Sequence, residues 1–250
     1  MADLPEIVYE GAHFLAVNKP AGMQVHPARI AAGKAAISQT AAADAGMLTD
    51  WLLARYPELA RVGDDPSTRP GIVHRLDKET SGIMLVPRDQ KYFEYLKGLF
   101  QKREIKKTYL AIVFGAPKNK KGTVDAPIGI VNGTLKRSIR SEKMAKPAVT
   151  EYEVVKTFED GERDGAPHAF SLLRVYPKTG RTHQIRVHLA SIGHPVVGDR
   201  LYGPKKQPPW ATRLMLHALS LEFTDAGGKR LKFEAEPPES FKNRLSTARF

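Results

Sequence analysis

The sequence predicts an α+β fold built around a mixed, mostly antiparallel sheet. Many short apolar runs are separated by turn residues, as strands joined by turns are, and only a few segments have the apolar spacing of helices. No internal repeat, coiled-coil heptad or long linker interrupts the 250 residues, so we expect a single domain over residues 1–250. A chain of this length can bury a substantial core.

The chain begins with two strand-like runs, residues 7–9 and 14–17, around a Gly-Ala-His turn that suits a hairpin. Residues 28–46 are rich in alanine and small polar residues and lack apolar periodicity. We expect a flexible surface loop there, with a frayed helix as the alternative. Thr49 is the candidate N-cap of a helix over residues 50–56.

Later segments continue this alternation of strands and helices. A helix is predicted over residues 89–102, where aromatic and leucine side chains recur at helical spacing. Residues 182–193 fit both a strand and a helix, but a glycine at the C′ position and several helix-forming residues favour a helix. A charged turn is expected over residues 159–165, and a last short helix over residues 240–245. The remaining predicted strands are residues 83–86, 108–114, 148–156 and 169–176, with a hairpin of 219–223 and 231–233.

Composition limits the function classes. The formal net charge of +12 favours a polyanionic partner, although a basic surface also serves solubility. The absence of cysteine excludes disulfides, thiolate metal sites and cysteine nucleophiles. No secretory signal is recognisable, and no apolar run approaches the roughly 20 residues that span a bilayer. We therefore expect a cytoplasmic protein without a membrane partner.

A polar crest over residues 74–82 lies between two apolar anchors, which would hold it rigidly while its side chains stay accessible. Within it, Asp77 is flanked by Arg75 and Lys78, whose charges favour the ionised carboxylate. Such a carboxylate in a sheltered cleft can act as a nucleophile or a base. The alternative is an Asx turn in which Asp77 accepts from the backbone of Glu79 or Thr80.

Two further polar segments are candidates for binding. Residues 180–188 place several side chains that can donate to anions or bases within a few turns, and a solvated basic face is the equal alternative. Tyr109, after Lys107 at the start of a strand, is either a core or rim residue or a stacking platform for an extruded base. Four histidines cluster in sequence, but their spacing does not put two on one helical face, so no metal site is expected. They are His183, His188, His194 and His217.

Together these segments resemble the RluA-type RNA pseudouridine synthases. The crest His74-Arg75-Leu76-Asp77-Lys78-Glu79-Thr80-Ser81-Gly82 is similar to the family signature His-Arg-Leu-Asp-x-x-Thr-Ser-Gly. The resemblance extends, in the family's order, to residues 18–22, 107–111, 180–188, 193–199 and 216–218. It covers about residues 7 to 223.

The resemblance implies isomerisation of uridine in RNA to pseudouridine, without metal or cofactor. Asp77 matches the essential aspartate of the family, which is thought to attack the ribose or the uracil or to assist formation of a glycal-like intermediate. Tyr109 matches the tyrosine that stacks on the target base, and Arg186 matches the basic residue that pairs with the aspartate. The implied fold is a bent sheet with a central cleft, to which two halves contribute Asp77 and Arg186.

Further residues are expected to contact RNA. Arg75 matches the residue that enters the RNA stack where the uridine leaves it. The other expected contacts are His74, Lys107, Arg181 and His183, and the basic runs 102–107, 118–121 and 136–146 would follow phosphates. Ribosomal and transfer RNA are both compatible partners, and a monomer is expected. The strand before residue 18 begins within the first ten residues, so we expect no S4 domain ahead of the catalytic domain.

Two alternatives remain open at this point. The first is a basic RNA-binding or ribosome-assembly protein that has kept the fold and lost turnover. The second is a glycosidase acting on nucleosides, which needs a second carboxyl about 5–10 Å from the first. Glu79 and Glu104 are the nearby candidates in sequence, and neither has a distinctive context.

Overall fold

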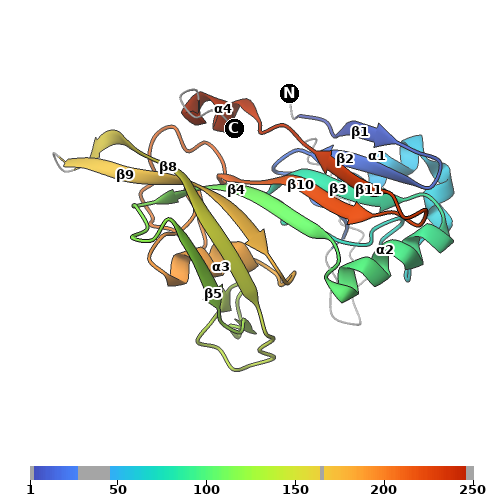
Figure 1. The fold of residues 1–250 in the computed structure, drawn as a ribbon, viewed down its shortest axis with the longest axis horizontal. Helices are drawn as coiled ribbons and strands as arrows, with labels where there is room; N and C mark the ends of the chain where they lie inside the picture. The colour runs from blue at the N-terminus through green and yellow to red at the C-terminus, as the bar shows by residue number, and fades with distance from the viewer. Residues whose placement is uncertain (1–2, 28–45, 164–165, 246–250) are drawn as a thin grey trace. The chain divides into compact units, whose positions relative to one another are not determined.

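The computed structural model describes residues 3–27, 46–163 and 166–245. The predicted loop over residues 28–46 therefore lies outside the described residues, except for Gly46. The chain divides into two compact units, Met1–Lys102 and Arg103–Phe250. Their strands and helices are drawn in Figure 1.

The described residues of the first unit form a three-stranded antiparallel sheet and two α-helices. The strands are β1 (Glu6–Glu10), β2 (Phe14–Lys19) and β3 (Ser81–Pro87), with β2 in the middle. All seven residues of β3 are buried, as expected of a strand covered on both faces. The predicted N-terminal hairpin and the strand after the crest are confirmed. The helices are α1 (Leu48–Arg55), the 3-10 helix η1 (Pro57–Arg61) and α2 (Gln90–Lys102).

The predicted cap of α1 is wrong. The helix begins at Leu48, so Thr49 lies inside the first turn and is buried. The backbone N–H groups of Leu48 and Thr49 donate to the carbonyl oxygens of Gln24 and Val25, at 2.8 and 3.1 Å. Tertiary backbone contacts thus satisfy donors that a capping side chain would otherwise take up.

The second unit is an antiparallel sheet in the order β11, β10, β4, β9, β8, β5. Together with the first unit it confirms the predicted α+β class and mostly antiparallel sheet. The strands are β4 (Lys106–Phe114), β5 (Lys121–Asp125), β8 (Val149–Arg163), β9 (Ala166–Pro177), β10 (Leu216–Thr224) and β11 (Arg230–Glu234). A separate small hairpin is formed by β6 (Gly129–Ile130) and β7 (Arg137–Ser138).

The charged turn expected over residues 159–165 is largely a paired strand instead. The ladder of β8 and β9 continues, with a bulge, to the pairing of Arg163 with Ala166. The apolar pattern ends before this extension, but a strand ladder is held by backbone hydrogen bonds and does not need apolar side chains where it leaves the core.

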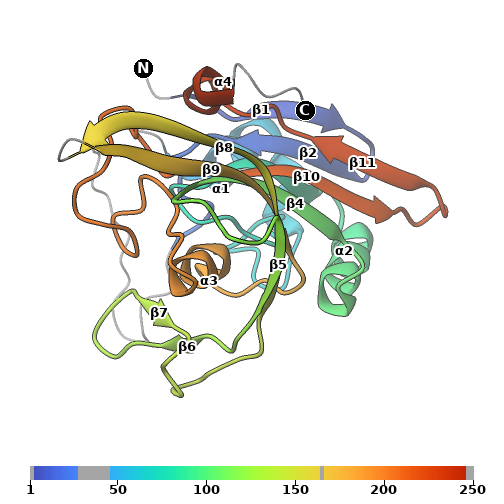
Figure 2. The same cartoon turned by 60° about the vertical axis from the view of Figure 1, so that its left-hand side comes forward.

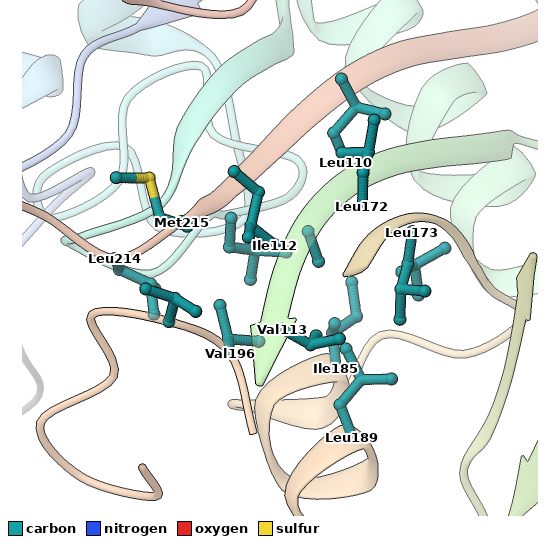
Figure 3. Close-up of a cluster of buried hydrophobic side chains, with 14 of the residues drawn as sticks. Leu110, Ile112, Val113, Leu172, Leu173, Ile185, Leu189, Val196, Leu214 and Met215 are labelled. Atoms are coloured by element: carbon teal, nitrogen blue, oxygen red, sulfur yellow. The ribbon is translucent and has the colours of Figure 1, made fainter. Parts of the chain in front are cut away.

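The helices of the second unit confirm the predictions. The ambiguous run forms α3 (Gln184–Ser191), and Gly193 follows its C-cap in the left-handed conformation, with φ +84°. The last helix, α4, covers Glu239–Leu245. Figure 3 shows Ile185 and Leu189 of α3 in the main apolar cluster, with side chains of β4 and β9. This packing fixes the helix that carries Arg186.

Candidate active site

The crest is a turn closed by backbone atoms. The N–H of Thr80 donates to the carbonyl oxygen of Asp77 at 3.1 Å, while the Asp77 side chain is half-buried. Leu76, Thr80 and Ser81 are buried on either side of it. The turn therefore has a backbone hydrogen bond of its own, and buried neighbours hold the position of Asp77.

The buried side chain of Lys19 anchors this crest. Its side chain is fully buried, and its ammonium donates to the carbonyl oxygens of Pro20, Met23 and Lys78 at 2.7, 2.8 and 3.1 Å. The N–H of Gly22 donates to the same Lys78 carbonyl at 2.9 Å. The turn after β2 is thus joined to the residue that follows Asp77.

The two residues expected to meet RNA at the crest have different surroundings. Arg75 is exposed, and its Nη1 lies 3.4 Å from Nε2 of the buried His26. Burial lowers the pKa of His26, so that ring is neutral and can accept from the guanidinium. His74 instead accepts the N–H of Leu85 at 2.9 Å and stacks on Phe100 at 4.4 Å between ring centroids. Its ring therefore fastens the crest to β3.

In the second unit, Arg186 forms a bidentate ion pair with Asp199. Nε and Nη2 of Arg186 donate to the two carboxylate oxygens of Asp199 at 2.7 and 2.8 Å, and both side chains are buried. Burial alone would raise the pKa of Asp199, but the hydrogen bonds and charge of Arg186 lower it below the ordinary aspartate range. Asp199 therefore stays ionised and holds the guanidinium plane in one orientation.

The ring of Tyr202 also contacts the guanidinium of Arg186. Its ring centroid is 5.2 Å from the guanidinium carbon of Arg186, and its hydroxyl lies 2.8 Å from Nδ1 of His183. His183 is the N-cap of α3 and has a left-handed backbone, with φ +58°. For a residue other than glycine this conformation is uncommon, so the surrounding contacts must hold it.

A buried polar network fixes α3 against the sheet. Thr179 Oγ1 donates to Gln184 Oε1 at 2.6 Å, and Gln184 Nε2 donates to Thr150 Oγ1 at 3.0 Å. Thr150 Oγ1 is also 2.9 Å from Nδ1 of His188, whose Nε2 lies 3.0 Å from the carbonyl oxygen of Ala126. Burial lowers the pKa of His188, which keeps the ring neutral.

The other predicted residues of the second unit occupy β4 and the start of α3. Tyr109 is half-buried on β4, opposite Val175 of β9, and packs against the main apolar cluster. Lys107 donates to the carbonyl oxygen of Thr179 at 3.4 Å. Burial, with a smaller effect of the Arg103 charge, lowers the pKa of Lys107 to about 8.

Arg181 is half-exposed, and its Nε donates to the carbonyl oxygen of Pro147 at 3.1 Å. The structure thus gathers Arg186 and His183 around Tyr202, and places Arg181 at the entry to the same helix. In the first unit it places His74, Arg75 and Asp77 on one crest.

Three residues of these sites went without a role in the sequence analysis. Lys19 and Asp199 lie in segments noted there only for their resemblance, and Tyr202 lies in none. A usable signal was the spacing of Asp199 and Tyr202, because an acid and an aromatic residue three positions apart on a turn can face one basic side chain. Lys19 offered no such signal, since its partners are backbone carbonyls.

The four histidines that lie near one another in sequence were not expected to bind a metal ion. Within residues 3–27, 46–163 and 166–245, no group of three or more His, Asp or Glu side chains is placed to hold a metal ion. His188 and His217 instead contact backbone carbonyl oxygens, those of Ala126 and Ala235.

Within the same described ranges, no helix has the length and apolar character required to cross a bilayer.

The chain's relationship to known proteins agrees with these motifs. A family model described as RNA pseudouridylate synthase matches residues 13–191, more than half of the chain. The chain belongs to the RNA pseudouridylate synthase family. This confirms the RluA-type resemblance. Pseudouridine synthases are isomerases, so the expected enzyme class is that of the family.

Individual relatives match over most of the chain. A ribosomal large subunit pseudouridine synthase D of Pseudomonas aeruginosa is 38% identical over 98% of this chain and 72% of its own length. An uncharacterized RNA pseudouridine synthase of Chloroflexus aurantiacus is 42% identical over 82% of this chain, and the match spans only 56% of that protein. The solved structure of human RNA pseudouridylate synthase domain containing 1 is 27% identical, with a TM-score of 0.69 over 94% of this chain and 84% of that one.

Proposed function

We propose that this chain isomerises uridine to pseudouridine in RNA, with Asp77 as the catalytic carboxylate. The observation that carries the proposal is the intact crest motif around Asp77 in a chain that belongs to the pseudouridylate synthase family. The reaction breaks the bond between N1 of uracil and C1′ of ribose and joins C5 to C1′. C5 releases its proton to solvent, and N1 takes one up. Atoms are otherwise conserved, so we propose that the chain's own side chains suffice and that no cofactor takes part.

The proposed roles follow the properties of each side chain. Asp77 would act in its ionised form, as attacking group or as base, from a crest fixed by buried neighbours. Tyr109 would stack on the extruded base, and Arg186 would steady charge at Asp77. Pairing of Arg186 with Asp77 stays a prediction. We further propose that both compact units serve one catalytic domain over residues 1–250.

The proposed substrate is ribosomal RNA of the large subunit. Support comes from relatives named ribosomal large subunit pseudouridine synthase D, of which the Pseudomonas aeruginosa protein matches 98% of the chain. The net charge of +12 suits any large RNA, so transfer RNA is the competing outcome. Mapping pseudouridines in total RNA with and without the gene separates the two, since each RNA would lose its own modified position.

The decisive variant is Asp77→Asn, which keeps the size of the side chain and removes its charge. With RNA carrying tritium at C5 of uridine, the unaltered protein should release tritium, and the variant should release none while binding RNA within a few-fold. Release by the variant would remove Asp77 from catalysis. An unaltered protein that binds RNA but releases no tritium would favour the non-catalytic RNA-binding alternative. Cleavage of free nucleosides would favour the glycosidase.

A further inference from the structure

Asp199 and Tyr202 hold Arg186 from a single turn. The carboxylate oxygen Oδ1 of Asp199 accepts the N–H groups of Leu201 and Tyr202 at 2.9 and 3.1 Å, in addition to Nη2 of Arg186 at 2.8 Å. The carboxylate that binds the guanidinium therefore also shapes the backbone that presents the Tyr202 ring. A displacement of Tyr202 is therefore expected to change the position of the Arg186 guanidinium.

The hydroxyl of Tyr202 is fastened to two other elements. The backbone N–H of Arg137, in β7, donates to it at 2.8 Å, and Nδ1 of His183, at the start of α3, lies 2.8 Å away. Since an N–H can only donate, the hydroxyl oxygen is the acceptor toward Arg137, and the hydroxyl proton can be given to His183. Tyr202 thus connects β7, the start of α3 and the Arg186 guanidinium.

Arg137 belongs to a segment that we call the basic arm, residues 128–146. It contains the β6–β7 hairpin, which lies below α3 in Figure 2. Ile128 and Ile139 of the arm pack in a small apolar cluster with Val187 of α3 and with Tyr202. The arm therefore packs against the helix that carries Arg186, and Tyr202 is part of this packing contact.

The exposed side chains of the arm are suited to a polyanion. The arm has five basic residues and one acidic residue, and within the described residues none of the five forms an ion pair with a carboxylate. Four of the five are exposed. They are Lys136, Arg140, Lys143 and Lys146. Leu135, at the hairpin tip beside them, is 81% exposed, and an apolar side chain among cations can insert between bases.

We propose that Tyr202 is a positioning residue that transmits RNA binding on the basic arm to the guanidinium of Arg186. This inference rests on the proposed function, because it takes the partner to be RNA and Arg186 to serve the reaction. Phosphates bound by the arm immobilise β7, and the Arg137 N–H then holds the Tyr202 hydroxyl. The Tyr202 ring stays against the Arg186 guanidinium, and the two hydrogen bonds from Asp199 keep the guanidinium in its orientation. RNA on the arm would thus further restrict a guanidinium that Asp199 already orients.

The first test is Tyr202→Phe, which keeps the ring and removes both hydroxyl contacts. With saturating large-subunit ribosomal RNA, we expect the single-turnover rate to fall about tenfold, the effect of one to two lost hydrogen bonds, while affinity changes about twofold or less. Tyr152→Phe is the matched control, because the Tyr152 hydroxyl makes no hydrogen bond with any described residue. A rate unchanged in Tyr202→Phe overturns the proposal.

The second test separates transmission from a merely structural role. Neutralising the arm with Lys136→Ala and Arg140→Ala should weaken RNA binding in every background. It should also lower the saturated rate of the unaltered protein, but not that of Tyr202→Phe, in which the connection is already broken. Effects on the rate that simply multiply would show that the arm and Tyr202 act independently, and would overturn the proposal.

A readout without catalysis keeps this inference distinct from the proposed function. Hydrogen exchange of the Arg186 Nε–H, followed by nitrogen-15 NMR, should slow when a uridine-containing RNA hairpin is added, and should not slow in Tyr202→Phe. If that difference is seen but no pseudouridine forms, the connection stands and the proposed function fails. If pseudouridine forms and exchange responds equally in both proteins, the proposed function stands and the connection fails.

Discussion

The ammonium of Lys19 donates to the carbonyl oxygen of Lys78, the residue after Asp77, at 3.1 Å. Lys19→Met keeps the length of the side chain and leaves its backbone acceptors without this donor. We expect the free energy of unfolding to fall by about 2–3 kcal/mol, the cost of buried acceptors left unsatisfied. Urea denaturation measures it, and tritium release should fall with it because the crest loses its anchor.

Lys91→Met is the matched control for this variant. Lys91 is exposed on α2, and its replacement should change the free energy of unfolding by about 0.5 kcal/mol or less. A Lys19→Met protein as stable and as active as this control would show that the crest is held by its buried neighbours alone.

Thr150 joins Gln184 to His188 in the buried network under α3. Thr150→Val has the same shape and removes the hydroxyl, so the amide of Gln184 and Nδ1 of His188 both lose a partner. We expect a loss of about 1–3 kcal/mol in the free energy of unfolding. Thr123→Val, on the exposed side of β5, is the control and should be nearly neutral. Equal stability of the two variants would mean that water or a rearranged side chain replaces the hydroxyl.

How well the sequence predicts an element of this fold depends on how far apart in the chain the interacting residues are. Strands such as β3 and helices such as α2 have their own apolar periodicity, so their positions were predictable. The start of α1 was not, because its first N–H groups find partners on Gln24 and Val25, more than twenty residues away along the chain. Local patterns carry no record of such distant backbone partners.

The candidate site shows the same division. The crest is one continuous segment, so Asp77 and its neighbours could be recognised together. The surroundings of Arg186 come from separate segments that only the fold brings together: Asp199 and Tyr202 on one turn, and Arg137 on the basic arm, which contacts Tyr202. Spacing predicted the helix of Arg186 but could not identify these partners.

His217 makes the stability of the second unit sensitive to acid. Burial lowers the pKa of His217 to about 4, while its Nε2 contacts the carbonyl oxygen of Ala235 at 2.9 Å. The unfolded chain binds this proton near pH 6.5 and the folded one only near pH 4, so stability is present above pH 6.5 and is lost as pH falls toward 4. The full loss from this group is about 3 kcal/mol.

His217→Gln tests this dependence, because the amide can still donate to Ala235 and does not titrate. Urea denaturation between pH 7 and pH 4.5 should show a smaller loss of stability in the variant than in the unaltered protein. Parallel pH profiles for the two proteins would assign the acid sensitivity to other groups, such as the buried His188 and His26.

Lys107 should make RNA binding sensitive to alkaline pH. Its pKa is lowered to about 8, so its charge is lost between pH 7 and pH 9, where ordinary lysines stay protonated. If Lys107 contacts RNA phosphate, as the sequence analysis expects, RNA affinity at constant ionic strength should weaken across this window. Lys107→Arg should remain charged and show little change, and Lys107→Met should bind weakly at every pH.

The stability of the folded chain should move in the opposite direction over a higher window. Between pH 8 and pH 10.5 the unfolded chain still holds the Lys107 proton and the folded chain does not, so this group makes the protein more stable as pH rises. Fluorescence anisotropy with labelled RNA and urea denaturation of the same samples measure both trends. Affinity that falls equally in Lys107→Met and in the unaltered protein would place the titrating contact elsewhere, because only Lys107 differs between them.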